Sequence, residues 1–267
     1  MTDAANSEAQ PDADPAVPAE LDAEKPTAVQ EVVEIVKTVV YALLIALVLR
    51  IFLFQPFTIP SDSMEPNLLH GDYIIVSKWP YGYSKHSIPF SPPVIKGRIL
   101  AGAPKRGDIV VFKLPSNNKT DYIKRLIGLP GDRVQVRNGV LFVNETAVPR
   151  ARVDVDALRA QGRIAVQETS ADGKAYVTYS GAGYGDVNNT PVFLVPAGHY
   201  FFMGDNRDNS LDSRVSPTTG GVGFVPAENL VGKAEIILLS WEPEAALFKP
   251  WTWFLEARPG RFFKPLK

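Results

Sequence analysis

The stretch VVEIVKTVVYALLIALVLRIFLF, from Val32 to Phe54, decides the architecture of this chain. As a helix it is long enough to cross a hydrocarbon core about 30 Å thick. Its charged residues, among them Arg50, lie toward the two ends, where long side chains can extend to the membrane surface. A buried helix of a soluble protein is the alternative, because the uninterrupted apolar part is short. We predict a single transmembrane anchor at residues 32–55.

The residues before this stretch, 1–31, are acidic, rich in Ala and Pro and free of aromatic side chains, so they predict a disordered tail. A cleaved targeting peptide begins with basic residues and ends in a small-x-small site after its apolar run. Neither feature flanks this run. The anchor is therefore expected to remain attached.

The composition narrows the chemistry that the chain can perform. The 267 residues carry a formal net charge of −1, no cysteine and three histidines. No segment forms a basic stripe, so a nucleic-acid partner is not expected. The absence of cysteine excludes thiol nucleophiles, disulfides and thiolate metal sites. Reactive groups must come from serines, lysines, acids and the three histidines.

Beyond Pro56 the sequence consists of short β-branched and aromatic runs separated by Gly, Pro, Asn and Asp. Such runs predict an antiparallel β-sheet, and hence a mainly β protein behind a single N-terminal transmembrane helix. The clearest runs are Tyr73–Val76, Asp108–Phe112 and Lys233–Leu239. The expected parts are a β core at 56–137 and 199–240, an inserted smaller β lobe at 138–198, and a C-terminal tail at 241–267.

Two segments stand apart from the β pattern. The stretch 80–103 is dense in Pro, Gly and Ser and predicts an ordered surface loop. The tail 241–267 interleaves aromatic residues with Lys and Arg, a mixture that suits a membrane interface. Ordinary packing of this tail on the β core is the equally weighted alternative.

A turn rich in hydroxyl groups, Ile59 to Pro66, follows the anchor almost directly. A Ser-His-Asp triad would require one of the three histidines near a serine, but no Gly-x-Ser-x-Gly elbow occurs. A lone histidine is more often structural. The histidines are His70, His86 and His199. The remaining base for a serine is a lysine, and Lys124 lies in an alternating strand-like run with apolar neighbours.

Lys124 can act as a base only if its pKa is lowered. With an ordinary pKa near 10.4, a lysine is neutral in about one molecule in 2,500 at pH 7. Apolar burial can lower the pKa by about 2 to 3 units, which corresponds to roughly 3 to 4 kcal/mol of disfavoured charge. Without such burial, Lys124 is an exposed strand lysine.

The third feature is an acidic turn, Gly204 to Arg214. It resembles a calcium loop at first sight, but an EF-hand counted from Asp205 needs Gly at its sixth position and Glu at its twelfth. Ser210 and Ser216 occupy those positions. A turn held by Asx hydrogen bonds and Arg-carboxylate pairs is the alternative that spacing alone favours.

Four blocks in this order resemble those of type I signal peptidases (leader peptidases), bacterial membrane endopeptidases that use a Ser-Lys dyad. The blocks are Pro60–Leu68, Lys105–Phe112, Tyr122–Arg125 with Gly128–Asp132, and Gly204–Arg214. Each block alone is weak, but the four in the family's order are very specific. The resemblance extends from the membrane span to about Ser240. Asn67 departs from it, because the family usually has Thr there.

The resemblance implies a role for each polar residue of the blocks. Ser63 is implied as nucleophile and neutral Lys124 as general base, with an acyl-enzyme ester between them. The Ser63 backbone N–H and the Ser61 hydroxyl would stabilise the oxyanion. Ser210 would hold the lysine amine, and an ion pair would support the turn. That pair is Asp212 with Arg214. The resemblance implies the signal peptidase fold, no metal and no cofactor.

The implied substrate is an extended peptide that adds as a strand beside 55–63 and 121–124. Small residues, typically Ala, are expected one and three positions before the cut, because alternate side chains of an extended chain face one wall. The expected lining residues are Phe57, Ile59, Pro60, Met64, Leu68, Asp121, Tyr122 and Ile123.

The expected partners are preproteins bearing signal peptides, membrane lipid and the secretion machinery. The resemblance places the peptidase domain on the extracytoplasmic side of the bacterial cytoplasmic membrane, whereas the charges flanking the span leave its orientation open. Two rival readings remain. One is another Ser-Lys peptidase, such as a self-cleaving repressor, and the other is a catalytically silent membrane-anchored β module that binds secreted chains.

Overall fold

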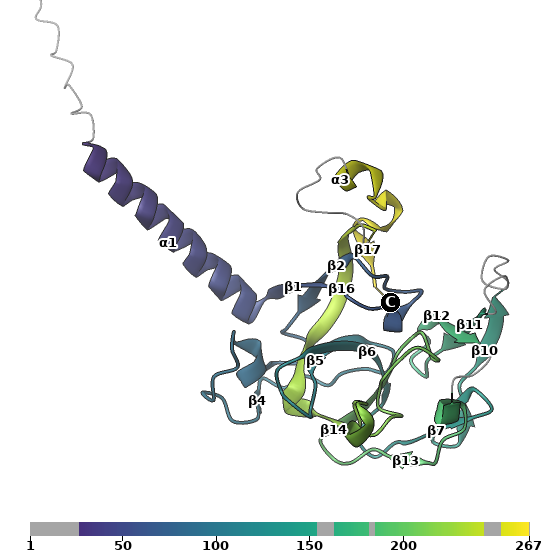
Figure 1. Ribbon diagram of the computed structural model, residues 1–267. Coiled ribbons are helices and arrows are strands. Elements are labelled where there is room, and N and C mark those ends of the chain that lie inside the picture. Colours follow the sequence, from purple (N-terminus) through teal and green to yellow (C-terminus); the bar gives the residue numbers. More distant parts are fainter. Residues whose placement is uncertain (1–26, 154–162, 182–184, 243–251, 267) are drawn as a thin grey trace, which may run out of the picture. The chain divides into compact units, whose positions relative to one another are not determined.

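The computed structural model describes residues 27–153, 163–181, 185–242 and 252–266 of the chain. The chain divides into two units, Met1–Leu44 and Ile45–Lys267. The first unit holds most of one long helix and the second holds the β-sheets (Figure 1). The predicted tail at 1–31 lies, up to residue 26, outside the described residues.

Helix α1 spans Ala28–Phe52, and none of its side chains is buried. Its 25 residues extend for about 38 Å, so it is long and apolar enough to cross a membrane. It begins four residues before the expected start of the span. The reason is a capping box, in which Thr27 N donates to the Gln30 side chain at 2.8 Å and Gln30 N donates to the Thr27 hydroxyl at 3.4 Å.

The second unit is mainly β, which confirms the predicted fold class. Its largest sheet is antiparallel, with the order β1-β2-β16-β5-β6-β14-β15 and with β17 paired to β16 (Figure 1). The strands are β1 (Phe54–Thr58), β2 (Asp72–Ser77), β5 (Ile109–Lys113), β6 (Asp121–Gly128), β14 (His199–Met203), β15 (Val225–Pro226), β16 (Leu230–Ser240) and β17 (Lys264–Pro265). Strand β1 is an edge strand, which explains how it tolerates Pro56.

The core of this sheet supports the turn after β1. The cluster of buried apolar side chains there includes Ile59, Met64 and Leu68 from that turn and Ile109 and Ile123 from the paired strands β5 and β6. Burial of a side chain of this size stabilises the fold by about 1.5 to 3 kcal/mol. Both the turn and β6 are therefore anchored in one apolar cluster, which fixes their mutual position.

Three smaller sheets complete the unit. Four strands pair in the order β13-β7-β8-β9, three in the order β10-β11-β12, and β3 pairs with β4. They are β3 (Tyr83–Ser84), β4 (Arg98–Ile99), β7 (Arg133–Arg137), β8 (Val140–Val143), β9 (Thr146–Ala147), β10 (Arg150–Val153), β11 (Arg163–Thr169), β12 (Ala175–Gly181) and β13 (Phe193–Leu194). Short 3-10 helices are η1 (Asp62–Met64), η2 (Lys85–Ser87), η3 (Gly185–Asn188), η4 (Pro217–Thr219), η5 (Ala227–Asn229) and η6 (Pro259–Arg261).

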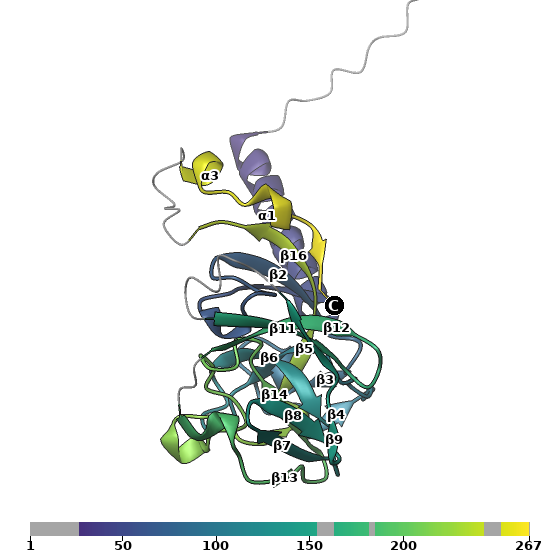
Figure 2. The ribbon, with the colours of Figure 1, turned by 90° about the vertical axis from the view of Figure 1, so that its right-hand side faces the viewer.

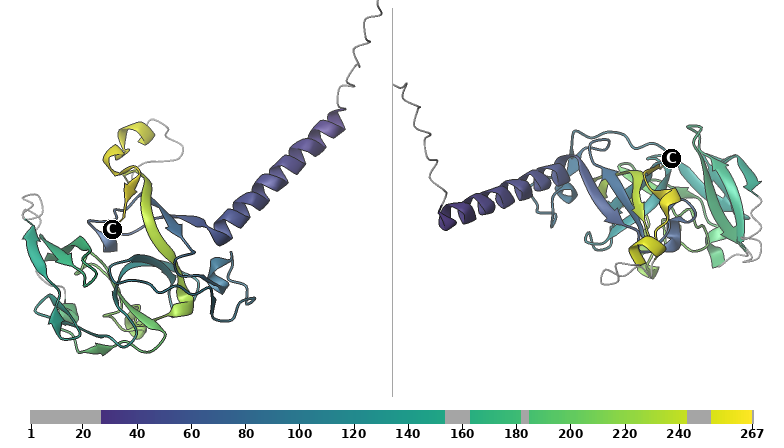
Figure 3. Two further views of the ribbon diagram at one scale, coloured as in Figure 1. Left: turned by 180° about the vertical axis from the view of Figure 1, so that it is seen from behind. Right: turned by 90° about the horizontal axis from the view of Figure 1, so that it is seen from above.

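The expected lobe at 138–198 differs from the observed sheets. The sequence predicted that residues 133–137, which form β7, belong to the β core. In the structure β7 pairs with β8 and β13, which both lie within 138–198. The boundary at residue 138 therefore falls inside one sheet. Figure 2 shows β7, β8, β9 and β13 grouped away from β2 and β16. Both views in Figure 3 show the β10-β11-β12 sheet at one end of this unit. The insertion thus forms two sheets, one of which includes β7.

The described part of the C-terminal tail packs on the β core. Trp241 contacts the rings of Tyr73 and Phe262 at centroid distances of 5.6 and 5.8 Å, and β17 pairs with β16 after the short helix α3 (Thr252–Leu255). Phe254 and Phe263 remain exposed. Residues 243–251 lie outside the described residues. Membrane contact by this tail stays a prediction.

Candidate active site

Ser63 lies in η1, at the turn that follows β1 and Ile59. Its side chain is buried, with 9% exposure, between the flanking core residues of the turn. The carbonyl oxygen of Ser63 accepts a hydrogen bond of 3.1 Å from the backbone N–H of Asn206. The hydroxyls of Ser61 and Ser63 lie 3.4 Å apart. The acidic turn of the sequence is therefore bonded directly to the serine turn.

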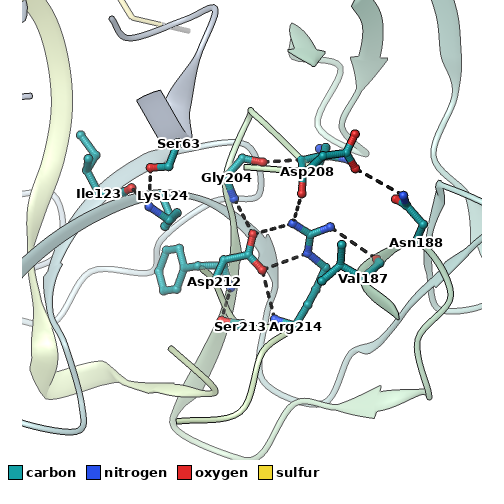
Figure 4. A network of polar contacts seen from close by, with 12 residues as sticks. Ser63, Ile123, Lys124, Val187, Asn188, Gly204, Asp208, Asp212, Ser213 and Arg214 are labelled. Atoms are coloured by element: carbon teal, nitrogen blue, oxygen red, sulfur yellow. Dashed lines mark hydrogen bonds and ion pairs between the residues drawn. The ribbon is translucent and has the colours of Figure 1, made fainter. Parts of the chain in front are cut away.

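Lys124 reaches the same point from β6. Its Nζ donates a hydrogen bond of 2.7 Å to the Ser63 Oγ and one of 3.0 Å to the Ile123 carbonyl oxygen (Figure 4). The side chain is only 4% exposed. The ring of Tyr122 lies below the amine, 5.3 Å from Nζ to the centroid. The two residues that the sequence singled out, 61 positions apart, are in direct contact.

Burial lowers the pKa of Lys124 to about 8, although the negative charges of Asp212 and Asp205 act in the opposite direction. At pH 7 an amine with that pKa is neutral in about one molecule in ten. This fraction is roughly 200 times larger than that of an exposed lysine, which makes the amine usable as a base.

Asp212 and Arg214 form a buried ion pair within the acidic turn. Arg214 donates from Nε to Asp212 Oδ1 at 2.9 Å and from Nη2 to Oδ2 at 2.8 Å, and Gly204 N donates to Oδ2 at 3.0 Å (Figure 4). Burial alone would raise the pKa of Asp212, but the charge and hydrogen bonds of Arg214 outweigh it and hold the pKa below its usual value. The carboxylate therefore stays ionised.

Ser210 lies against Gly204, and its hydroxyl is buried with no hydrogen-bond partner in the described part of the chain. The expected bond from Ser210 to the lysine amine is thus not formed in this structure. A methyl group on Gly204 would lie 2.3 Å from Ser210 Oγ and 2.5 Å from the Ser63 carbonyl oxygen. Only glycine fits between these two serines.

Two further buried ion pairs join the acidic turn to β6 and to the β10-β11-β12 sheet. Arg125 of β6 pairs with Asp205 at 2.7 Å, and Arg207 pairs with Glu168 of β11 at 2.5 Å. The amide of Asn67 donates to Asp205 at 2.7 Å, so the residue that departs from the family pattern is part of this network. These pairs could not be predicted from the sequence, because residues so far apart along the chain show no spacing signal.

A groove of about 590 Å³ opens over the Ser63 hydroxyl and the Lys124 amine. Of the predicted lining residues, Pro60, Asp121, Tyr122 and Ile123 line it. Residues that the sequence did not single out complete the wall. These are Thr120, Val187, Asp208, Asn209, Leu211 and Val215. The sequence signal that could have indicated part of this wall is Leu211, an apolar residue inside the acidic turn. In the structure its side chain is exposed.

Four other predicted lining residues do not line the groove. Ile59, Met64 and Leu68 are fully buried in the apolar core, and Phe57 packs against that core. Their spacing in the turn reflects core packing. Direct contact of these four side chains with substrate stays a prediction, since Ile123 belongs to the same apolar cluster and also lines the groove.

Comparison with known proteins supports one family. The family model of signal peptidase, peptidase S26, matches residues 32–241. Signal peptidase I of Rickettsia typhi is 40% identical over 247 residues, covering 85% of this chain and 90% of the relative. The enzyme of Rickettsia felis is 41% identical over 245 residues, with 85% and 90% covered. The crystal structure of a signal peptidase I from Enterococcus faecalis aligns with a TM-score of 0.30 and 28% identity, covering 49% of this chain and 96% of that one.

The family match spans most of the chain, including the predicted anchor and the strands that carry Ser63 and Lys124. The Rickettsia relatives are aligned over nearly their whole length. The chain therefore belongs to the signal peptidase family, peptidase S26, and is a serine endopeptidase that processes signal peptides.

Proposed function

We propose that Ser63 is the nucleophile and Lys124 the general base of this peptidase. The observation that carries the proposal is the 2.7 Å hydrogen bond between the Lys124 amine and the Ser63 hydroxyl, both of which are buried. In the neutral amine, the lone pair takes the hydroxyl proton while Oγ attacks the scissile carbonyl. The ammonium then protonates the leaving amine, and an acyl-enzyme ester remains on Ser63.

We assign two donors to the oxyanion of this step. The first is the backbone N–H of Ser63, the residue that carries the attacking oxygen. The second is the Ser61 hydroxyl, which lies 3.4 Å from Ser63 Oγ and makes no hydrogen bond to the N-terminus of η1. A hydroxyl without such a bond is free to turn toward a developing negative charge. Loss of one oxyanion donor typically lowers turnover about 100- to 1,000-fold.

The substrate binds as an added strand between the edge strand β1 and the first half of β6. On the β14 side of β6 only Arg125, Leu126 and Gly128 pair with a partner, so that edge is open at residues 121–124. Alternate side chains of an extended peptide face one wall. Tyr122 and Ile123 flank the reacting atoms and favour small residues at the first and third positions before the cut.

The anchor supports a position at a membrane. Helix α1 is long and apolar enough to span the bilayer of the bacterial cytoplasmic membrane. We place the β unit on the extracytoplasmic side, where exported preproteins emerge, beside lipid and the secretion machinery. Protease protection of the two chain ends in sealed vesicles tests this orientation.

Cleavage of a preprotein with an Ala-x-Ala site, followed by mass spectrometry of the new N-terminus, tests the proposal. We expect a cut directly after the second Ala, and a large loss of cleavage when Leu replaces either Ala. Ser63→Ala is the matched inactive control. A folded wild type that binds the preprotein without cutting it would support the rival binding module.

A further inference from the structure

A second hollow, which we call the basic pocket, lies apart from the reacting atoms. It has a volume of about 420 Å³, close to that of the smaller binding sites for organic ligands. Its principal charged and ring-bearing residues are Arg50, His86, Phe90, Lys113, Lys119 and Asp121. Three cations and one carboxylate thus surround it.

The positive charge of the basic pocket is incompletely neutralised. Lys113 is paired with Asp121 at 2.9 Å. Arg50 and Lys119 have no carboxylate within ion-pair distance among the residues that the structure describes. The field extends inward, since the pKa of the neighbouring buried Lys78 is lowered to about 8 first by burial and then by the charge of Arg50. The pocket is therefore suited to an anion.

His86 supplies a polar group already buried at this site. It is 4% exposed, its Nδ1 lies 2.9 Å from the Ser91 hydroxyl, and its Nε2 has no hydrogen-bond partner within the described chain. Burial first, and then the charges of Lys85 and Lys113, lower the pKa of His86 to about 4, so the ring is neutral at pH 7. If the Ser91 hydroxyl donates to Nδ1, the Nε2–H is left as a free donor.

The surroundings of the pocket are those of a membrane interface. Arg50 lies two residues before the end of α1, where a spanning helix meets the headgroups. Phe90, which lines the pocket, is fully exposed, and Leu100 of the same surface loop is 80% exposed. The exposed rings of Phe54 and Trp79 pack edge to face, with centroids 4.8 Å apart. Exposed apolar groups beside cations are typical of surfaces that enter the headgroup region.

We propose that the basic pocket binds the phosphate of an anionic phospholipid, with Arg50 and Lys119 as its ion-pair partners, His86 as a neutral donor and Phe90 among the acyl chains. A lipid is favoured over a free phosphate because Arg50 ends the membrane-spanning helix and exposed apolar side chains border the site. Asp121 lines both the basic pocket and the groove over Ser63, so the bound headgroup lies next to the substrate path. The proposal is independent of the chemistry assigned to Ser63 and Lys124.

Native mass spectrometry of the detergent-solubilised full chain, mixed with equal amounts of phosphatidylglycerol and phosphatidylcholine, tests this assignment. We expect wild type to retain phosphatidylglycerol preferentially, and Arg50→Gln and Lys119→Gln each to weaken that retention about fivefold, the contribution of one cation at an anionic surface. Lys96→Gln, which removes an exposed lysine of the same loop outside the pocket, is the matched control and should retain the wild-type preference.

Peptide cleavage in detergent should be unchanged in all three variants, which shows that they are folded. Equal retention of both lipids by wild type, or equal effects of the pocket and control variants, would overturn the proposal. So would displacement of the lipid by an equimolar amount of inorganic phosphate, which would assign the pocket to a free anion. A raised KM in the pocket variants without a lipid preference would assign it to the substrate segment upstream of the cut. A wild type that binds phosphatidylglycerol but cleaves nothing would contradict the proposed dyad alone.

Discussion

The side chain of Asn206 holds the serine turn at two points beside its backbone bond to Ser63. Its Nδ2 donates to the Asp62 carbonyl oxygen at 3.1 Å and to Glu65 Oε2 at 3.3 Å. The acidic turn thus holds Asp62 and Glu65, the residues on either side of the Ser63–Met64 pair. This relationship makes Asn206 a positioning residue for Ser63.

Asn206→Ala should therefore lower kcat about 10- to 100-fold while leaving KM nearly unchanged, because a small displacement of the nucleophile has a large effect on rate. Steady-state kinetics with a signal-peptide substrate measure both constants. A thermal melt of the same preparation serves as the folding control. If Asn206→Gln lowers kcat and the melting temperature as much as Asn206→Ala does, the Asn206 side chain contributes only to stability.

The pKa of Lys124 predicts the pH dependence of catalysis. Because the pKa is lowered to about 8 and the base must be neutral, kcat/KM should rise about tenfold per pH unit below pH 8 and level off above it. A lysine with an ordinary pKa would give a rise that continues beyond pH 10. A pH–rate profile between pH 6 and about pH 10 decides between the two.

The same lowered pKa predicts how stability depends on pH. Below pH 8 the lysine is charged in both the folded and the unfolded state, so folding bears the full cost of burying that charge. Between pH 8 and about 10.5 the folded state releases the proton first, so stability rises by roughly 3 kcal/mol. Lys124→Met should reduce the rise by about that amount and leave the separate contribution of buried Lys78, whose pKa is also lowered to about 8. Denaturant melts at several pH values measure the free energy of unfolding. If its dependence on pH is the same in Lys124→Met as in the wild type, the titrating group lies elsewhere.

Ser210 offers a test that separates stability from catalysis. Its hydroxyl is buried and without a partner in the described residues, so Ser210→Ala should leave stability unchanged or raise it by about 1 kcal/mol. Turnover should nevertheless fall, because we expect the Ser210 hydroxyl to hydrogen-bond the Lys124 amine in the substrate complex. Catalytic hydrogen bonds that are long in a free enzyme often shorten when substrate binds. Urea melts and kcat are measured on one preparation. Wild-type turnover in Ser210→Ala would remove Ser210 from the catalytic apparatus.

Asp212→Asn should act on both stability and the base. It leaves Arg214 buried without its counter-ion, which typically costs about 3 to 5 kcal/mol. It also removes a charge that raises the pKa of Lys124, so the midpoint of the pH–rate profile should move to lower pH. The double variant Asp212→Asn/Arg214→Met restores stability and keeps the lowered midpoint. A midpoint that moves upward would contradict the electrostatic argument.

The sequence was enough to predict the transmembrane helix, the mainly β fold and the family, because local sequence patterns determine them. The apolar run of α1 and the alternating β runs predicted the anchor and the mainly β fold, and the four blocks predicted the family. The start of α1 was missed because the capping box of Thr27 and Gln30 precedes the apolar run. Boundaries set by caps need polar side-chain geometry that hydropathy does not contain.

The groove could be predicted only in part. Tyr122 and Ile123 adjoin the reacting lysine in sequence and line the groove. Ile59 and Met64 look equivalent by the same criterion, but they are buried in the core, because which side of a turn faces inward depends on partners far along the chain. Val187 and Leu211 come from segments brought to the site only by tertiary folding.

The direct contact between the Lys124 amine and the Ser63 hydroxyl is most directly tested by cleavage of an Ala-x-Ala preprotein by wild type, Ser63→Ala and Lys124→Ala. We predict that wild type alone releases a product beginning directly after the second Ala, and that both variants bind the substrate and lose cleavage. Cleavage that survives Lys124→Ala in a folded protein would contradict the account, because another group would then be the base.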